Sequence, residues 1–215
     1  MPSEPVDPDR PVDPDQPAGP DLPATSYAVL GLLSFGEELS GYDLKMWADW
    51  TIRFFYWSPS FSQIYSHLKR LESLGYVRSR TVESASARDR RLYSITEAGL
   101  AVMRRWAATA PLDPPVLKHS LLLRVWLGHL ADAARLEQLL TEHLDHVRQL
   151  AANAEARRQG AARGAWAYPE AALRWAHRYY EAEAALAEAL LADLRDLADR
   201  PVDPTGHLAG PQAAE

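Results

Sequence analysis

The side chains best suited to hydrogen bonding and ionic contact lie close together between residues 60 and 74. They combine small hydroxyl groups, one amide, one phenol and two cations: Ser62, Gln63, Tyr65, Ser66, Lys69, Arg70 and Ser73. Small side chains let a helix approach a surface closely, an amide can pair with an adenine edge, and Lys or Arg can reach guanine or phosphate. This combination favours contact with the major groove of DNA, although the solvated face of an ordinary amphipathic helix has a similar composition.

A helix that begins after Ser60 is expected to position these groups. Ser60 is a good N-cap, and Gln63 stands at the third helical position, as a capping box requires. Gly75 is expected to end the helix. Apolar residues recur at spacings of three and four, which places them together on the opposite face: Phe61, Ile64, Leu68, Leu71 and Leu74.

A β-hairpin is expected directly after this helix. Residues 76–83 are β-prone and partly alternating, residues 84–89 are small and polar, and residues 90–95 have the character of a returning strand. Three arginines are expected at or beside the tip of the hairpin: Arg88, Arg90 and Arg91. The hairpin would therefore present cations beside the polar face of the preceding helix.

Three further helices are expected around these two elements. Thr25 is the expected N-cap for residues 27–33, and Ser40 is the expected N-cap for a helix that ends near residue 49 or 51. Thr96 is expected to open a helix that reaches about Trp106. The order helix, helix, helix, hairpin, helix predicts a winged helix-turn-helix, with residues 60–74 as the DNA-reading helix and the hairpin as the wing.

The composition is typical of a globular protein, with 47% hydrophobic and 24% charged residues. The formal net charge is −6. Between Ser60 and Trp106, however, nine cationic residues face four acidic ones, so the stretch expected to bind DNA is locally basic. There is no cysteine and no apolar run long enough to span a membrane, so we expect a cytoplasmic protein without disulfides or membrane contact.

The C-terminal half is expected to be helical. Residues 110–115 have the composition of a linker, and residues 116–129 are predicted to form one helix. The next helix, from about Ala131, has an apolar seam at heptad-like steps: Leu136, Leu140, His143, Val147, Leu150 and Ala154. Gly160 and Gly164 are expected to mark the turn, and a last helix from Tyr168 carries a second seam: Leu173, Ala176, Tyr180, Ala187, Leu190, Leu194 and Leu197.

These patterns predict a mainly α fold with a small β-hairpin, in which an N-terminal winged helix-turn-helix precedes a C-terminal α-helical dimerisation domain. The expected boundaries are a disordered Pro/Asp-rich tail over 1–24, the winged domain over 25–110, the helical dimerisation and effector domain over 111–199, and a flexible tail over 200–215. Two long apolar seams are more than one protomer needs to cover its own core, so a homodimer is expected.

Several stretches resemble the PadR family of transcriptional regulators. The resemblance lies in Tyr27–Leu33, Ser40-Gly41-Tyr42-Asp43-Leu44, Gln63-Ile64-Tyr65 with Leu68 and Leu71, Gly75-Tyr76-Val77, and Tyr93-Ser94-Ile95-Thr96-Glu97-Ala98-Gly99. It implies a homodimeric DNA-binding protein, usually a repressor, whose C-terminal helices form the dimer and which senses a small, often aromatic, molecule. It also implies that the motif tyrosines, Tyr42 and Tyr65 here, face DNA.

The resulting hypothesis is a repressor that binds a palindromic operator in double-stranded DNA and is released by a small aromatic effector. Base readout is assigned to Ser62, Gln63 and Ser66, with Lys69 as a further candidate for it. Phosphate contact is assigned to Tyr65, Lys69, Arg70 and the wing arginines Arg88, Arg90 and Arg91. Trp126, Trp175 and Tyr179 are the candidate effector-binding residues.

Two alternatives remain open at this stage. One is a helical protein that binds a small molecule and whose winged domain no longer binds DNA. The other is a metal-dependent enzyme that uses His143 and His146, which lie one helical turn apart. No third ligand motif, phosphate-binding loop or nucleophile elbow accompanies these histidines, so no metal, cofactor or catalytic residue is expected.

Overall fold

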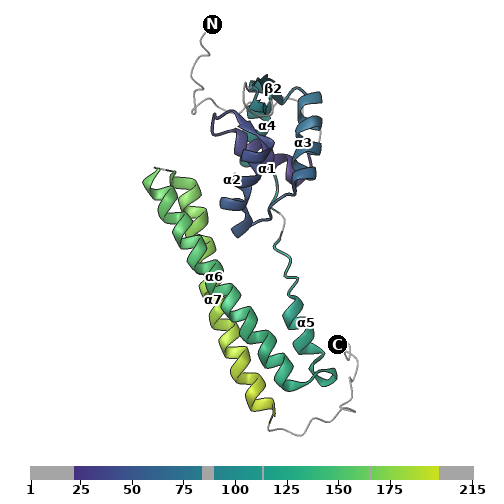
Figure 1. Ribbon diagram of the computed structural model, residues 1–215, viewed down its shortest axis with the longest axis vertical. Helices are drawn as coiled ribbons and strands as arrows, with labels where there is room; N and C mark the ends of the chain where they lie inside the picture. Colours follow the sequence, from purple (N-terminus) through teal and green to yellow (C-terminus); the bar gives the residue numbers. More distant parts are fainter. Residues whose placement is uncertain (1–21, 84–89, 113, 165, 199–215) are drawn as a thin grey trace, which may run out of the picture. The chain divides into compact units, whose positions relative to one another are not determined.

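In a computed structural model, the chain forms two compact units that divide between Pro114 and Pro115 (Figure 1). The structure describes residues 22–83, 90–112, 114–164 and 166–198. Most of both predicted tails, and Arg88 at the predicted wing tip, therefore lie outside the described residues. None of the helices within these ranges is both long and apolar enough to cross a membrane.

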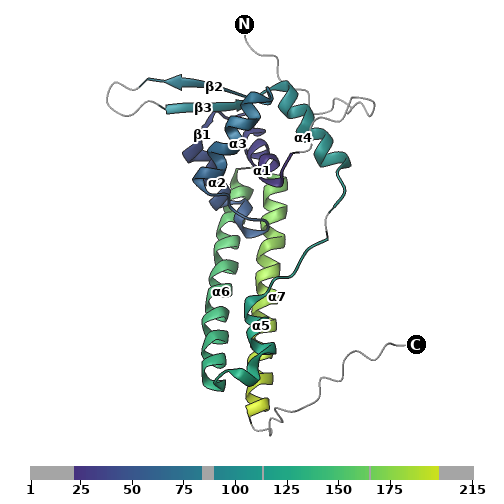
Figure 2. The same ribbon diagram turned by 90° about the vertical axis from the view of Figure 1, so that its right-hand side faces the viewer.

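The first unit has the predicted order of elements, with one short strand and one 3-10 helix added. Its elements are α1 Ala24–Leu33, β1 Leu39–Ser40, α2 Gly41–Trp50, the 3-10 helix η1 Ile52–Phe54, α3 Phe61–Ser73, β2 Val77–Val82, β3 Arg90–Ile95 and α4 Glu97–Thr109. The hairpin strands β2 and β3 lie side by side (Figure 2), and the antiparallel sheet has the order β1-β3-β2. The sequence did not indicate β1, because two residues are too few to show an alternating pattern.

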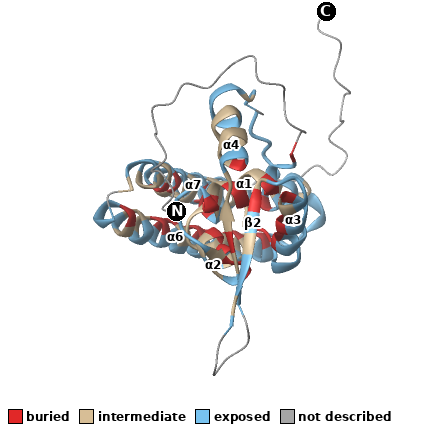
Figure 3. Cartoon of the chain, turned by 90° about the horizontal axis from the view of Figure 1, so that it is seen from above, coloured by how far each residue is buried: buried red, intermediate tan, exposed pale blue. Residues whose placement is uncertain are grey.

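The core of this unit is built where α1, α2, α3 and the sheet meet. Its largest fully buried side chains come from the first three helices: Val29, Leu30, Leu33, Leu44, Ile64, Leu68 and Leu71. Buried positions on α1, α3 and β2 are red in Figure 3. The predicted apolar face of α3 is too long, because Phe61 and Leu74 at its two ends are 44% and 36% exposed.

Local side chains fix most helix starts in this unit. Ser40 and Ser60 each accept a hydrogen bond from the third helical N–H in a reciprocal capping box, and Thr96 accepts one from the N–H of Gly99, as predicted. Gly75, at φ +74°, follows α3 in the left-handed conformation that glycine favours. The predicted cap at Thr25 is wrong, because α1 already begins at Ala24 behind the buried Leu22, and Thr25 lies buried inside the helix.

The second unit consists of α5 Ser120–Trp126, the 3-10 helix η2 Gly128–Leu130, α6 Ala133–Arg163 and α7 Ala167–Ala198. The long helices α6 and α7 run side by side in opposite directions (Figures 1 and 2). The single helix predicted over 116–129 is wrong. His119 caps a helix of only 7 residues, and the chain then passes through η2 before Asp132 caps α6.

The predicted seams of the long helices are correct only in part. Leu136, Leu140, Val147 and Ala154 of α6 are buried, but Leu144 and Ala151 are buried in place of the predicted His143 and Leu150. A straight helix drifts from a strict seven-residue repeat by about 20° per heptad, so its inner face moves to the next residue. On α7, Leu173, Ala176 and Ala187 are buried, Tyr180, Leu190 and Leu194 are half-buried, and Leu197 is exposed. Gly160 lies within α6, which ends at Arg163 with Gly164 as its C-cap.

Candidate nucleic-acid interface

The structure brings the predicted reading residues together on one solvent-facing side of α3. Ile64, Leu68 and Leu71 hold the opposite side in the core. The polar side chains are all exposed: Ser62, Gln63, Tyr65, Ser66, Lys69 and Arg70. The helix therefore offers hydroxyl, amide and cationic groups to a partner on a rigid, well-anchored element.

Two of the predicted base-reading residues also stabilise the start of α3. The side-chain oxygen Oε1 of Gln63 accepts a hydrogen bond from the N–H of Ser60 at 2.8 Å. The hydroxyl groups of Ser60 and Ser62 are 3.0 Å apart. Because its carbonyl is engaged, Gln63 can donate from its amide nitrogen, but a two-bond contact with adenine would require it to leave the cap.

Tyr42 and Tyr65 join the two sequence stretches that carry the family resemblance. The ring of Tyr65 covers Gly41 at the start of α2, and a Cβ atom on Gly41 would lie 2.6 Å from that ring. Tyr42 stacks on Phe61, with ring centroids 6.2 Å apart. Both tyrosines remain exposed, at 58% for Tyr42 and 50% for Tyr65. The Gly41–Tyr65 contact explains why Ser-Gly-Tyr and Gln-Ile-Tyr occur together: one supplies the space that the other fills.

The described wing arginines are held by carboxylates of the helices beneath them. Arg90 pairs with Asp43 of α2 at 2.9 Å, and Arg91 pairs with Glu72 of α3 at 2.7 Å. Ser79 of β2 donates to Glu72 at 2.5 Å and accepts from Arg91 at 2.9 Å. These bonds fasten both strands of the hairpin to the reading helix and the helix before it.

The same contacts set the charge of the acids beneath the wing. Burial alone would raise the pKa of Asp43, but hydrogen bonds from Ser40 and the charge of Arg90 outweigh it and lower the pKa. Ser79 and then Arg91 lower the pKa of Glu72, against the effect of burial. Both groups are therefore carboxylates at neutral pH, so Arg90 and Arg91 face anions within the protein as well as any phosphate outside it.

The sequence alone does not reveal the acidic partners of the hairpin arginines or one buried hydrogen bond between α1 and α3. Glu38, Asp43 and Glu72 each pair with an arginine of the hairpin. Of these three acids, only Asp43 could be recognised from its sequence neighbours, because it stands at the capping-box position after Ser40. In addition, His67 of α3 shares a 2.8 Å hydrogen bond with the buried hydroxyl of Ser26 in α1, and burial, with the nearby Arg70, lowers the pKa of His67. This bond ties the reading helix to the first helix.

The candidate effector residues lie on the second unit and are exposed. Trp175 and Tyr179 of α7 stack with ring centroids 5.4 Å apart, and Trp126 of α5 is 71% exposed. A shallow groove of about 450 Å³ also runs between α6 and α7. None of the three predicted residues lines this groove, which is formed by Arg148, Ala151, Ala152, His177, Glu181, Ala184, Ala185 and Glu188.

Comparison with known proteins agrees with this geometry. Residues 29–105 match the family described as transcriptional regulator PadR-like. Over 100 residues the chain is 33% identical to the negative transcriptional regulator PadR of Bacillus subtilis (strain 168), a match that covers 46% of this chain and 54% of that protein. Over 84 residues it is 37% identical to the probable transcriptional regulator Rv1176c of Mycobacterium tuberculosis (strain ATCC 25618 / H37Rv). This match covers 39% of this chain and 43% of that protein. The chain thus spans about half the length of the curated relatives it matches.

Solved structures extend the likeness of fold to most of the chain. Bacillus subtilis PadR in complex with operator DNA superposes with a TM-score of 0.68 at 23% identity, over 80% of this chain and 99% of that one. The PadR-like transcriptional regulator BC1756 from Bacillus cereus superposes with a TM-score of 0.70 at 24% identity. The match covers 83% of this chain and 99% of that one. The mainly α fold with a winged first unit is thereby confirmed, and residues 29–105 are a domain of the transcriptional regulator PadR-like family.

Proposed function

We propose that this chain is a DNA-binding transcriptional regulator, most simply a homodimeric repressor. The observation that carries the proposal is the exposed polar and cationic face of α3, flanked by an arginine-bearing wing. The PadR-like match over residues 29–105 includes both elements. A relative of the same fold has been solved in complex with operator DNA, which supports double-stranded DNA as the partner. With DNA as its partner, the protein would act in the cytoplasm.

In this proposal, base readout belongs to Ser62, Gln63 and Ser66 at the start of α3. Phosphate contacts come from Tyr42, Tyr65, Lys69 and Arg70, and from the wing through Arg90, Arg91 and Arg88, the last outside the described residues. The two tyrosines suit a backbone contact, because each has one face packed within the protein and remains about half exposed.

Replacing Lys69 with alanine tests the reading helix. A dimer would lose two phosphate contacts, so affinity for DNA from upstream of the gene should fall about 30-fold at 150 mM salt, and the slope of log affinity against log salt should flatten by about 1.8. Arg163→Ala, which removes an exposed cation at the end of α6, is the matched control. Equal affinity of the two variants in a fluorescence anisotropy titration would count against DNA recognition by α3.

The dimer is proposed to form through the helical unit. Apolar side chains of α5 and η2 are strongly exposed in the single chain, including Leu123 at 59%, Trp126 at 71% and Leu130 at 75%. Large exposed apolar patches mark interaction surfaces, and two copies related by a two-fold axis would cover them and place two reading helices on a palindrome.

We expect Leu123→Glu to break the dimer, because it would place a carboxylate in the apolar contact. An interfacial cost of about 3 kcal/mol would raise the dimer dissociation constant roughly 150-fold. Leu112→Glu, in the linker at 96% exposure, should leave the dimer intact. Sedimentation velocity over a concentration series measures both, and an intact Leu123→Glu dimer would place the interface elsewhere.

The effector is proposed to be a small aromatic compound that binds beside Trp126, Trp175 and Tyr179. A structure of Bacillus subtilis PadR in complex with p-coumaric acid supports this class of ligand. Such a ligand releases DNA only if it binds the free protein more tightly than the DNA-bound form; a hundredfold difference corresponds to about 2.7 kcal/mol of coupling.

Tryptophan fluorescence tests the effector proposal. Titration with p-coumaric acid should quench the wild-type protein, and Trp175→Phe should reduce the quench. Operator DNA should shift the midpoint to higher ligand concentration. If p-coumaric acid quenches the fluorescence equally with and without DNA, it binds the protein but does not regulate DNA binding. If it does not quench at all, small aromatic compounds are not the effector.

A further inference from the structure

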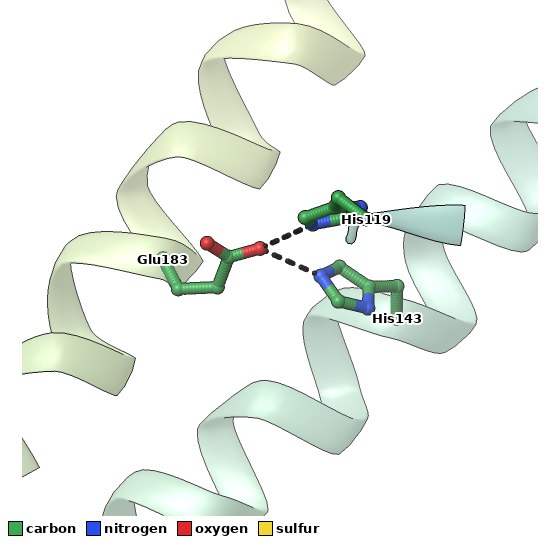
Figure 4. Close-up of side chains that lie close together, drawn as sticks. All are labelled: His119, His143 and Glu183. Carbon is green, nitrogen blue, oxygen red and sulfur yellow. Dashed lines mark hydrogen bonds and ion pairs between the residues drawn. The ribbon is translucent and has the colours of Figure 1, made fainter. Parts of the chain in front are cut away.

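Three side chains that are far apart in the sequence meet inside the helical unit (Figure 4). His119 stands just before α5, His143 lies on α6 and Glu183 lies on α7. The Nε2 atoms of His119 and His143 lie 2.8 Å and 3.0 Å from the same carboxylate oxygen, Oε1 of Glu183. All three side chains are largely shielded, with exposures of 16%, 25% and 15%.

We propose that this cluster binds a first-row divalent metal ion, with Zn²⁺ as the best fit. Two imidazole nitrogens and one carboxylate oxygen form a donor set that suits Zn²⁺, and three protein ligands leave a fourth position for water. The donor atoms converge already, since one from each residue lies within 4.8 Å of the other two. The site is independent of the proposed DNA-binding function.

Metal binding requires all three donor atoms to adjust, including the two histidine nitrogens, which lie within 4.8 Å of each other. In a tetrahedral site with bonds of about 2.1 Å, neighbouring donor atoms are about 3.4 Å apart. The two nitrogens must therefore move away from Oε1 of Glu183 by roughly half an ångström from their present 2.8 Å and 3.0 Å. Side-chain rotation can supply this, because each residue comes from a different helix or helix start.

Metal binding must also shift a proton on His119. Its Nδ1 accepts a hydrogen bond from the N–H of Leu122 at 3.3 Å, so without metal the ring proton is on Nε2 and points to Glu183. To coordinate through Nε2, the ring takes up a proton at Nδ1 and releases the one at Nε2, so its charge is unchanged. The same exchange is required of His143, because its Nε2–H donates to the carboxylate of Glu183 before metal binds. The long bond to Leu122 is lost, and the two bonds to Glu183 are replaced by coordination.

Bound metal would join α5, α6 and α7 at one point. His119 ends the stretch that leads from the winged unit, so the ion would fix the place where this stretch enters the helical unit. The sequence alone does not reveal the site, because His119, His143 and Glu183 have no motif spacing. The metal-dependent alternative drawn from the sequence pairs His143 with His146, and His146 is exposed and lies outside this cluster.

The test uses the full chain purified without a polyhistidine tag. Isothermal titration with ZnCl2 should show one ion per chain, and Co²⁺ should give the visible absorption bands of a tetrahedral site. His143→Ala and Glu183→Gln should each weaken Zn²⁺ binding more than about a hundredfold, beyond the loss seen when only an outer partner of a ligand is removed. His146→Ala, on the same helix, is the control and should bind like wild type.

Two further measurements distinguish a loss of metal binding from a loss of folding. Far-ultraviolet circular dichroism establishes that each variant is folded, and Zn²⁺ should raise the melting temperature of wild type and His146→Ala only. If Zn²⁺ does not bind wild type, the proposal is overturned. It is equally overturned if wild type and folded Glu183→Gln bind with the same affinity, since the ion would then occupy a surface histidine elsewhere.

Discussion

Raising the salt concentration from 50 to 200 mM is expected to weaken operator binding by roughly 10³–10⁵-fold. This range applies if the two reading helices and two wings of a dimer together neutralise about 6–10 phosphates, because each neutralised phosphate releases condensed counterions. Lys69 and Arg70 on α3, and Arg90 and Arg91 on β3, are the described cations assigned to this role. Anisotropy titrations at four salt concentrations give the slope directly.

The ion pairs of the wing make the slope informative. Arg90 and Arg91 are already paired with Asp43 and Glu72, so they contribute only if they exchange a carboxylate for a phosphate or hold both. If Arg90 and Arg91 do neither, only Lys69 and Arg70 of the two protomers contact phosphate. These four contacts would lower the affinity only about 150-fold over the same salt range. A flat response would contradict phosphate contact by the reading helix as well as by the wing.

Gly99→Ala is expected to unfold much of the winged unit at temperatures where the wild type is stable. A Cβ atom on Gly99 would lie 2.2 Å from the carbonyl oxygen of Tyr76 and 2.9 Å from Ile95, so backbone must move to admit it. Overpacking of this kind costs about 3 kcal/mol or more, which lowers the melting temperature of a small domain by roughly 12–24 °C. Scanning calorimetry of the full chain measures the change, and hydrogen exchange of α1 and α4 identifies the unit that melts.

Gly31→Ala is the matched control for this substitution. Gly31 also lies in a helix of the same unit, but an added Cβ atom there meets only the end of Met103 at 3.5 Å, which is an ordinary contact. Alanine favours a helix over glycine by up to about 1 kcal/mol, so the control should melt at or slightly above the wild-type temperature. Equal melting temperatures for the two variants would show that Tyr76 can move aside without cost.

The features predicted correctly from sequence are those set by neighbouring residues. Ser40, Ser60 and Thr96 cap helices with groups three residues away, and Ile64, Leu68 and Leu71 reveal a buried face by their spacing alone. The polar face of α3 follows directly, because it is the opposite side of the same helix. The exposed polar positions of α3 could therefore be placed before any tertiary contact was known.

The features that could not be predicted depend on contacts between distant residues. Glu72 meets Arg91 only because the hairpin folds back over α3, and His119 meets Glu183 only because α5 packs on α6, which runs alongside α7. The apolar run over 116–129 has helical composition, yet only Ser120–Trp126 forms an α-helix, since the side chain of His119 caps it late. Composition does not encode where such a cap will act.

The packing of Tyr65 on Gly41 has a consequence for engineering new operator specificity. A reading helix grafted from another regulator would carry foreign residues at positions 62, 63 and 66, where the proposed base contacts lie. It would dock at the native angle only if the graft keeps an aromatic ring at 65 and the recipient keeps glycine at 41, because the two surfaces are complementary. The transplantable module is therefore the reading helix together with the first turn of α2.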